Sequence, residues 1–294
     1  MIEAIAFAQC IACLLFISYK SIERLQEIKY WFPFQDIARI VSIFILSSIG
    51  LQITKPETHS IEIGHIAYLF CTVSDFFGGF CLKQAYATTA APIVVFISQL
   101  MFPMMSTYLY FIENAQGTSK LSVASFLIIL VICCLINVKS YKGKIKNVML
   151  GVFFAFGSNI CYIFNILYQN KIVSKIGAAL YLRNMSIYSV PVLFLSSLLI
   201  DYKNIPRSFK EITGFYKKNP VWIAISGVSL ASFYIFGSLF IEKYGPTAFN
   251  IATLTTSMYF GLYNMFYHFN LGYTCGYVIA MGFSILLFWS ELKK

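Results

Sequence analysis

Charged side chains inside long apolar segments are the residues of this sequence that could do chemistry. Asp75 is the acid furthest inside such a segment, and Arg39 lies about one turn inside the preceding apolar segment. A charge at the centre of a membrane span costs at least about 2.5 kcal/mol, so such residues usually face a cavity or a partner. Asp75 is therefore either a functional residue or half of a structural ion pair, for which Arg39 is one candidate partner.

Three further cations lie at or near the ends of apolar segments. Arg183 sits about one turn inside its segment, as Arg39 does, while Lys83 and Lys243 stand at segment ends. A guanidinium group pairs with phosphate oxygens through two parallel hydrogen bonds, so the two arginines could bind an anionic solute. They could equally extend to the lipid headgroups. The lysines are either interfacial anchors or ligand contacts.

Amides, hydroxyls and phenols form a second group of candidates because many of them are three or four residues apart and share a helix face. Such groups either hydrogen-bond a polar solute or link neighbouring helices. The tyrosines either stack on a solute and gate its path, or form an aromatic belt at the membrane interface. The members are Asn159, Tyr162, Asn165, Tyr181, Asn184, Tyr188, Asn250, Thr253, Thr256 and Ser257.

Catalytic and metal-binding patterns are missing from the sequence. There is no phosphate-binding glycine loop, His-Glu-x-x-His helix or Gly-x-Ser-x-Gly elbow, and the one Cys-x-x-Cys spacing, Cys10 to Cys13, lies inside an apolar run where a helix is expected. The eight cysteines lie in or beside apolar runs and are expected to be reduced packing residues. We therefore expect neither an enzyme nor a bound metal or cofactor.

The composition indicates the environment in which these residues work. The chain is 59% hydrophobic and 12% charged, whereas soluble domains carry roughly 25% charged residues. Too little polar surface exists to coat a soluble globule, so we predict an all-α integral membrane protein. The net charge of +10 is spread thinly between apolar runs, which favours lipid flanks and an anionic ligand over nucleic acid.

Ten membrane spans are predicted, since a spanning helix needs about 20 apolar residues. Breaks at Tyr86–Thr89 and at Gly245-Pro246 predict tight connections between spans. No loop is long enough for a soluble domain, so residues 1–294 form one membrane domain, and the first span is expected to be retained. The spans lie near 2–18, 35–53, 62–82, 88–111, 121–138, 148–169, 178–200, 220–241, 246–268 and 271–290.

An internal duplication organises these spans. Residues 236–269 resemble residues 77–110 in register, with Phe77 matching Phe236 and Gly78 matching Gly237. Repeat one then covers about 1–138 and repeat two about 148–290. Five spans per repeat invert the second half, which puts a solute site between the repeats near the membrane midplane.

Residues 236–288 resemble the closing helices of nucleotide-sugar transporters, within the drug/metabolite transporter superfamily. Thr255-Thr256 matches a threonine pair that these proteins often carry, although Ser257 stands where a basic residue often follows. Residues 181–184 are similar to a Tyr/Asn motif of the same proteins, with Arg183 replacing a usual Asn. The EamA-like branch of the superfamily is the second resemblance.

The resemblance implies a secondary active transporter, an antiporter for an anionic, phosphate-bearing metabolite such as a nucleotide sugar. An EamA-like carrier of a neutral or zwitterionic metabolite and a non-transporting membrane scaffold are the alternatives. A nucleotide-sugar carrier is expected in the Golgi or endoplasmic reticulum membrane, otherwise in the plasma membrane. Its partners are the solute and the lipid bilayer, with a homodimer left open, and its orientation is unassigned because charge counts and resemblance disagree.

In that carrier, Arg183 would bind phosphate and the residues near 250 would hold sugar or base groups. The expected solute contacts are Arg39, Asp75, Lys83, Asn159, Tyr162, Tyr181, Arg183, Asn184, Tyr188, Lys243, Asn250, Thr253 and Thr256.

Overall fold

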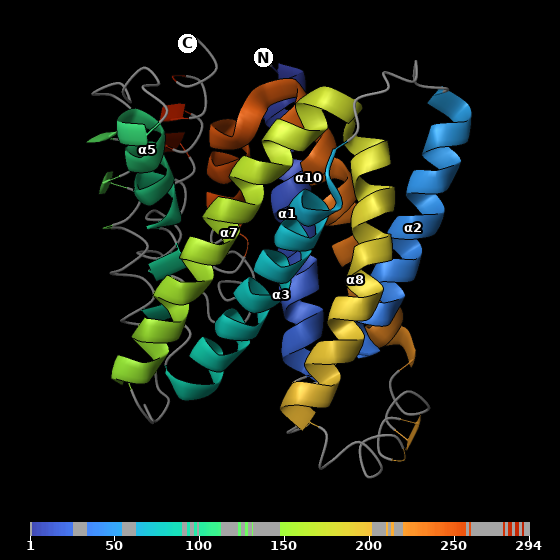
Figure 1. Ribbon diagram of the computed structural model, residues 1–294. Helices are drawn as coiled ribbons and strands as arrows, with labels where there is room; N and C mark the ends of the chain where they lie inside the picture. Colours follow the sequence, from blue (N-terminus) through green and yellow to red (C-terminus); the bar gives the residue numbers. More distant parts are fainter. Residues whose placement is uncertain are drawn as a thin grey trace. The chain divides into compact units, whose positions relative to one another are not determined.

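The computed structural model describes residues 2–25, 34–54, 63–89, 100–112, 148–201 and 220–256, together with scattered positions in 93–98, 123–131, 210–214 and 259–290. Within these residues the chain is helical and contains no strand, which confirms the predicted all-α class. The helices are α1 (Ile2–Leu25), α2 (Phe34–Thr54), α3 (His65–Thr88), α5 (Met101–Ile112), α7 (Val148–Ile176), α8 (Ala178–Asp201) and α10 (Pro220–Leu254) (Figure 1).

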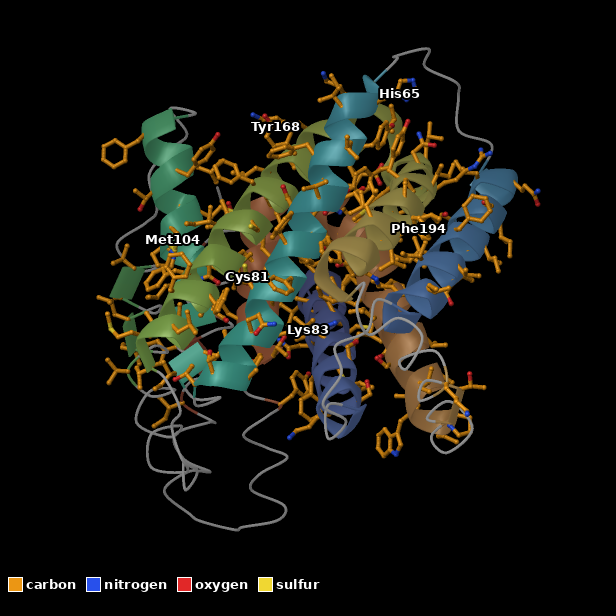
Figure 2. The ribbon with its side chains drawn as sticks, turned by 60° about the horizontal axis from the view of Figure 1, so that its bottom comes forward. His65, Cys81, Lys83, Met104, Tyr168 and Phe194 are labelled. Carbon is orange, nitrogen blue, oxygen red and sulfur yellow. The ribbon has the colours of Figure 1, made fainter. Side chains whose placement is uncertain are left out.

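Among the described residues, four helical segments are long and apolar enough to cross a membrane: His65–Thr88, Val148–Ile176, Ala178–Ser196 and Pro220–Leu254. Large apolar side chains cover their outer faces, as expected for helices in contact with lipid tails. Phe153 of α7 is 73% exposed and Phe194 of α8, labelled in Figure 2, is 65% exposed. The protein is therefore built as a membrane protein. The predicted spans 121–138 and 271–290 lie almost entirely outside the described residues, as does the later part of 246–268.

Two glycines with positive φ separate consecutive helical segments. Gly245 (φ 82°) interrupts α10 directly before Pro246, so the predicted break at this dipeptide is confirmed. Gly177 (φ 79°) alone separates α7 from α8, and its N–H donates to the Val173 carbonyl over 2.8 Å. A side chain disfavours positive φ, so glycine is the residue that ends a helix in this way.

The helices are grouped into two compact units by their contacts. Unit 1 contains Met1–Cys13, Phe77–Leu167 and Lys243–Lys294, and unit 2 contains Leu14–Phe76 and Tyr168–Glu242. The unit boundaries fall inside α1, α3, α7 and α10, so they differ from the predicted repeats 1–138 and 148–290. Each unit is described by itself.

Unit 2 holds the parts of α2, α3, α8 and α10 that carry the candidate site. Here α2 packs against α8 (Figure 1). Apolar side chains of several helices form one buried cluster that positions the polar residues described below. Its members are Ile43, Tyr68, Cys71, Ile172, Val173, Ala178, Tyr181, Leu182, Met185 and Ala231.

Candidate functional site

The centre of the candidate site in unit 2 is an ion pair between α2 and α3. Arg39 Nη1 lies 3.2 Å from Asp75 Oδ2, and the two side chains are only 12% and 6% exposed. Losing one partner of a buried ion pair leaves an uncompensated charge, which typically costs about 3–5 kcal/mol. Of the two roles that the sequence predicts for Asp75, the structure contains the ion pair with Arg39.

Tyr234 of α10 completes this pair. Its hydroxyl donates to Asp75 Oδ1 over 2.5 Å, and its ring lies 4.8 Å from the guanidinium carbon of Arg39. Both carboxylate oxygens of Asp75 are thus hydrogen-bonded, and the cation rests on an aromatic face that attracts positive charge. Sequence reasoning missed Tyr234, although the repeat offset of 159 maps Asp75 onto this very position.

A stack of tyrosines between α3 and α8 lies in the same unit. The ring of Tyr68 is 5.6 Å from that of Tyr188, nearly parallel at 4°, and 6.4 Å from that of Tyr181. Asn184 Nδ2 donates to the Tyr68 hydroxyl over 3.1 Å, and His65 Nδ1 hydrogen-bonds the Tyr188 hydroxyl. The structure therefore brings Tyr181, Asn184 and Tyr188 together on the face of α8 toward α3.

Sequence reasoning missed Tyr68 and His65 in this stack. Tyr68, Thr72 and Asp75 are spaced by four and three residues, which places them on one face of α3. That spacing was a readable signal for Tyr68. His65 is the first residue of α3 (Figure 2) and lies three residues before Tyr68, so the same spacing extends to it.

The hydroxyl of Tyr181 has no oxygen or nitrogen partner among the described residues of this cluster. The side chain is 1% exposed, and the hydroxyl interacts with the thiol of Cys71, which is a weak hydrogen-bonding group. A buried polar group left without a partner costs about 1–3 kcal/mol. Such a hydroxyl is suited to hydrogen-bond a polar atom of a solute.

The other predicted cations have different surroundings. Arg183 of α8 is exposed and forms no ion pair with a residue that the structure describes. Lys83 is partly buried on α3 (Figure 2). In unit 1, Lys243 Nζ lies 3.3 Å from Glu3 Oε1, with the two side chains 53% and 80% exposed. An exposed pair of this kind contributes about 0–1 kcal/mol.

The polar residues predicted in unit 1 mostly bond their own helices and neighbours. Asn159 Nδ2 donates to the Ile97 carbonyl over 2.6 Å, and Thr253 Oγ1 donates to the Asn250 carbonyl over 2.8 Å. Asn250 Nδ2 lies 4.0 Å from Met105 Sδ. The hydroxyl of Thr256 is buried and has no hydrogen-bond partner among the described residues. Asn159 and Thr253 therefore form hydrogen bonds within the protein, which is the alternative to solute binding that the sequence left open.

Tyr162 has a packing role in unit 1. Its ring covers Gly78 so closely that a Cβ at that glycine would lie 3.1 Å from the ring. One turn earlier on α7, Ser158 Oγ donates to the Gly78 carbonyl over 2.9 Å. Gly78 therefore allows α3 and α7 to approach each other closely.

Glu242 is a structural residue of unit 2 that sequence reasoning did not select. Its Oε2 accepts a hydrogen bond from the Ala178 N–H over 3.1 Å. Ala178 is the first residue of α8, where backbone N–H groups lack helical partners and favour a negative group. Glu242 thus caps α8 from another helix.

Among the residues that the structure describes, His, Cys, Asp and Glu form no group of three that could hold a metal ion. The chemistry of the unit 2 cluster is that of hydrogen bonding, ion pairing and aromatic stacking.

No protein-family model matches the chain, and a search of curated proteins finds no match. One solved structure, described only as "Crystal structure of protein", is similar over 95% of this chain and 96% of its own, with a TM-score of 0.65 and 11% sequence identity. This likeness shows a shared fold.

Proposed function

We propose that the protein is a membrane carrier for a small polar metabolite that has no net charge. The observation that carries this proposal is the buried Arg39–Asp75 pair, in which one of the two arginines that could bind an anionic solute is paired with a carboxylate. The neutral or zwitterionic alternative of the sequence analysis is therefore favoured over the phosphate-bearing one. Polar residues buried between membrane helices commonly mark solute or ion paths.

The carrier architecture is the inverted repeat of ten spans that the sequence predicts. Two observations support it. Asp75 and Tyr234, which are equivalent under the repeat offset of 159, contact each other, as equivalent residues do at a two-fold axis. The break at Gly245 separates the segments that the repeat assigns to two successive spans. Alternating access by such repeats gives a carrier or an antiporter.

A carrier of phosphate-bearing metabolites is the second candidate. The exposed guanidinium of Arg183 favours it, since this group forms no ion pair with a described residue and is free to approach an anion. A nucleotide-sugar carrier would then act in the Golgi or endoplasmic reticulum membrane.

Uptake into proteoliposomes separates these functions. We expect the purified protein to take up labelled neutral or zwitterionic metabolites above the level of protein-free liposomes, and R183Q to leave that uptake unchanged. Uptake restricted to nucleotide sugars or phosphate esters, and lost in R183Q, would establish the second candidate instead. A protein that takes up no neutral, zwitterionic or phosphate-bearing solute would instead be a scaffold.

A further inference from the structure

We propose that Lys175 of α7 and Arg183 of α8 bind the phosphate groups of anionic phospholipids, which makes the turn between these two helices a lipid-headgroup site. The site does not involve the Arg39–Asp75 pair and is independent of the solute that the protein carries. Two features support it: the faces that α7 and α8 expose, and the positions of the two charges along those faces.

One exposed face of α7 changes from apolar to basic along its length. Phe153, Ile160, Phe164, Tyr168 and Lys175 follow each other at intervals of four and seven residues, so they share this face. All five side chains are exposed, and Tyr168 is labelled in Figure 2. Tyrosine is enriched where a helix leaves the hydrocarbon for the headgroups. Lys175 therefore lies on the headgroup side of Tyr168.

The length of α7 leads to the same depth for Lys175. The helix has 29 residues and is therefore about 43 Å long, whereas the hydrocarbon core is only about 30 Å thick. Counted from Val148, the core is crossed in about 20 residues, which ends near Tyr168. Lys175 lies about two turns further along. Because helical side chains point back toward the N-terminus, its ammonium group leans toward the membrane.

The exposed face of α8 ends in a charge in the same way. Arg183, Ile187, Val190 and Phe194 are spaced by four, three and four residues, and the three apolar side chains are 50%, 58% and 65% exposed. Arg183 therefore belongs to the face that meets lipid tails, not to the buried face that carries Tyr181. It lies in the second turn of α8, and its side chain points back toward the start of the helix and hence toward the headgroups.

The end of α7 and the start of α8 form one hairpin. Gly177 alone separates the two helices, which run in opposite directions from this turn (Figure 1). Val173 of α7 and Ala178 of α8 belong to the same buried cluster, so the two helix ends pack together. Lys175 and Arg183 are thus held on neighbouring helices at the same end of the hairpin.

The charges at this turn suit a phosphate group. Neither Lys175 nor Arg183 forms an ion pair with a residue that the structure describes. Glu242 also lies here, but its Oε2 accepts the Ala178 N–H over 3.1 Å and so serves the start of α8. An ammonium group binds phosphate as a point charge and a guanidinium group binds it through a two-point fork. Anionic leaflets attract such cations close to the membrane surface.

Lipid binding by the purified full chain in detergent tests the site. The probes are anionic phosphatidylglycerol and zwitterionic phosphatidylcholine, titrated separately while bound lipids are counted by native mass spectrometry. We expect wild-type protein to prefer phosphatidylglycerol. In K175Q/R183Q, phosphatidylglycerol should bind at least about tenfold more weakly and phosphatidylcholine as before, since each cation near an anionic surface contributes about fivefold. The matched control is K243Q, which removes an exposed lysine that pairs with Glu3 and should keep the preference.

Equal affinity of the wild-type protein for the two lipids would overturn the proposal, and this arm does not depend on the folding of a variant. A preference that survives in K175Q/R183Q, or that K243Q also loses, would overturn it as well. Displacement of phosphatidylglycerol by an equal concentration of soluble glycerol 3-phosphate would assign the two cations to a soluble phosphate ester instead of a lipid. A protein without solute uptake would contradict the proposed function and leave the lipid site standing.

Discussion

At the scale of single residues, the polar side chains divide into those with partners and those without. Asp75 uses both oxygens on Arg39 and Tyr234, and Asn184 donates to Tyr68. The Tyr181 hydroxyl, equally buried, has no oxygen or nitrogen partner among the described residues and interacts with the Cys71 thiol. A buried hydroxyl whose partner is a weak hydrogen-bonding group is a candidate for solute contact.

The Y181F substitution separates folding from binding. Removing a buried hydroxyl that interacts with a thiol, a weak hydrogen-bonding group, should change the free energy of unfolding by no more than about 1 kcal/mol. Uptake of the solute should fall, because its hydrogen-bond partner is lost. Thermal unfolding of the detergent-solubilised protein and proteoliposome uptake measure the two effects. A lower melting temperature would instead indicate that the hydroxyl serves the fold.

The sequence predicted the types of these residues better than their pairing. The apolar context made Asp75 conspicuous and allowed Arg39 as its partner, whereas the selected tyrosines, Tyr162, Tyr181 and Tyr188, did not include the two that contact Asp75 and Asn184. Tyr68 and Tyr234 became recognisable only through helix spacing and the repeat offset. Arg183 shares its helix start with Tyr181 and Asn184, yet the helical rotation puts its side chain on the exposed face.

At the scale of elements, hydrophobic length predicted where helices exist, and polar ends obscured their boundaries. The segments near 35–53 and 178–200 agree closely with α2 and α8. By contrast, α1 continues to Leu25 and α7 to Ile176, beyond the predicted ends near 18 and 169. Residues such as Lys and Gln favour helices but are unfavourable in lipid. A span boundary predicted from hydropathy therefore lies before the observed end of the helix.

The cap on α8 can be tested at Glu242. E242A removes the acceptor of the Ala178 N–H and should lower the free energy of unfolding by about 0.5–2 kcal/mol. E242Q retains a carbonyl oxygen that can accept the same bond, so it should lose less. Thermal melting of both variants in detergent measures the difference. Equal losses would show that charge, rather than the hydrogen bond, stabilises the start of α8.

Close packing of α3 on α7 can be tested at Gly78. In G78A the new methyl group would lie 3.1 Å from the Tyr162 ring, and such overpacking costs about 1–3 kcal/mol. G50A is the matched control, because a Cβ at Gly50 of α2 meets nothing within 4 Å and alanine favours the helix. A G78A protein that melts no lower than G50A would contradict the packing described for unit 1.

At the scale of the whole molecule, composition determined the class and left the solute undefined. Only 12% of the residues are charged, which is typical of a membrane protein. The positive net charge favoured an anionic solute in the sequence analysis. The structure pairs the buried cation Arg39 with Asp75, a tertiary contact that net charge cannot reveal. The fold is shared with a solved structure at 11% identity, so its architecture is recognisable where its residues are not.

The central claim is that the Arg39–Asp75 pair serves the solute rather than the fold alone. The most direct measurement is the uptake of a labelled zwitterionic metabolite by proteoliposomes carrying the exchanged pair, Arg39→Asp with Asp75→Arg. This double variant retains opposite charges, so we expect its melting temperature to exceed that of either single variant. We expect uptake to remain lost, because the solute would have to bind in reverse against Tyr234 and Tyr181. Uptake restored together with stability would contradict the account and leave the pair as a structural contact.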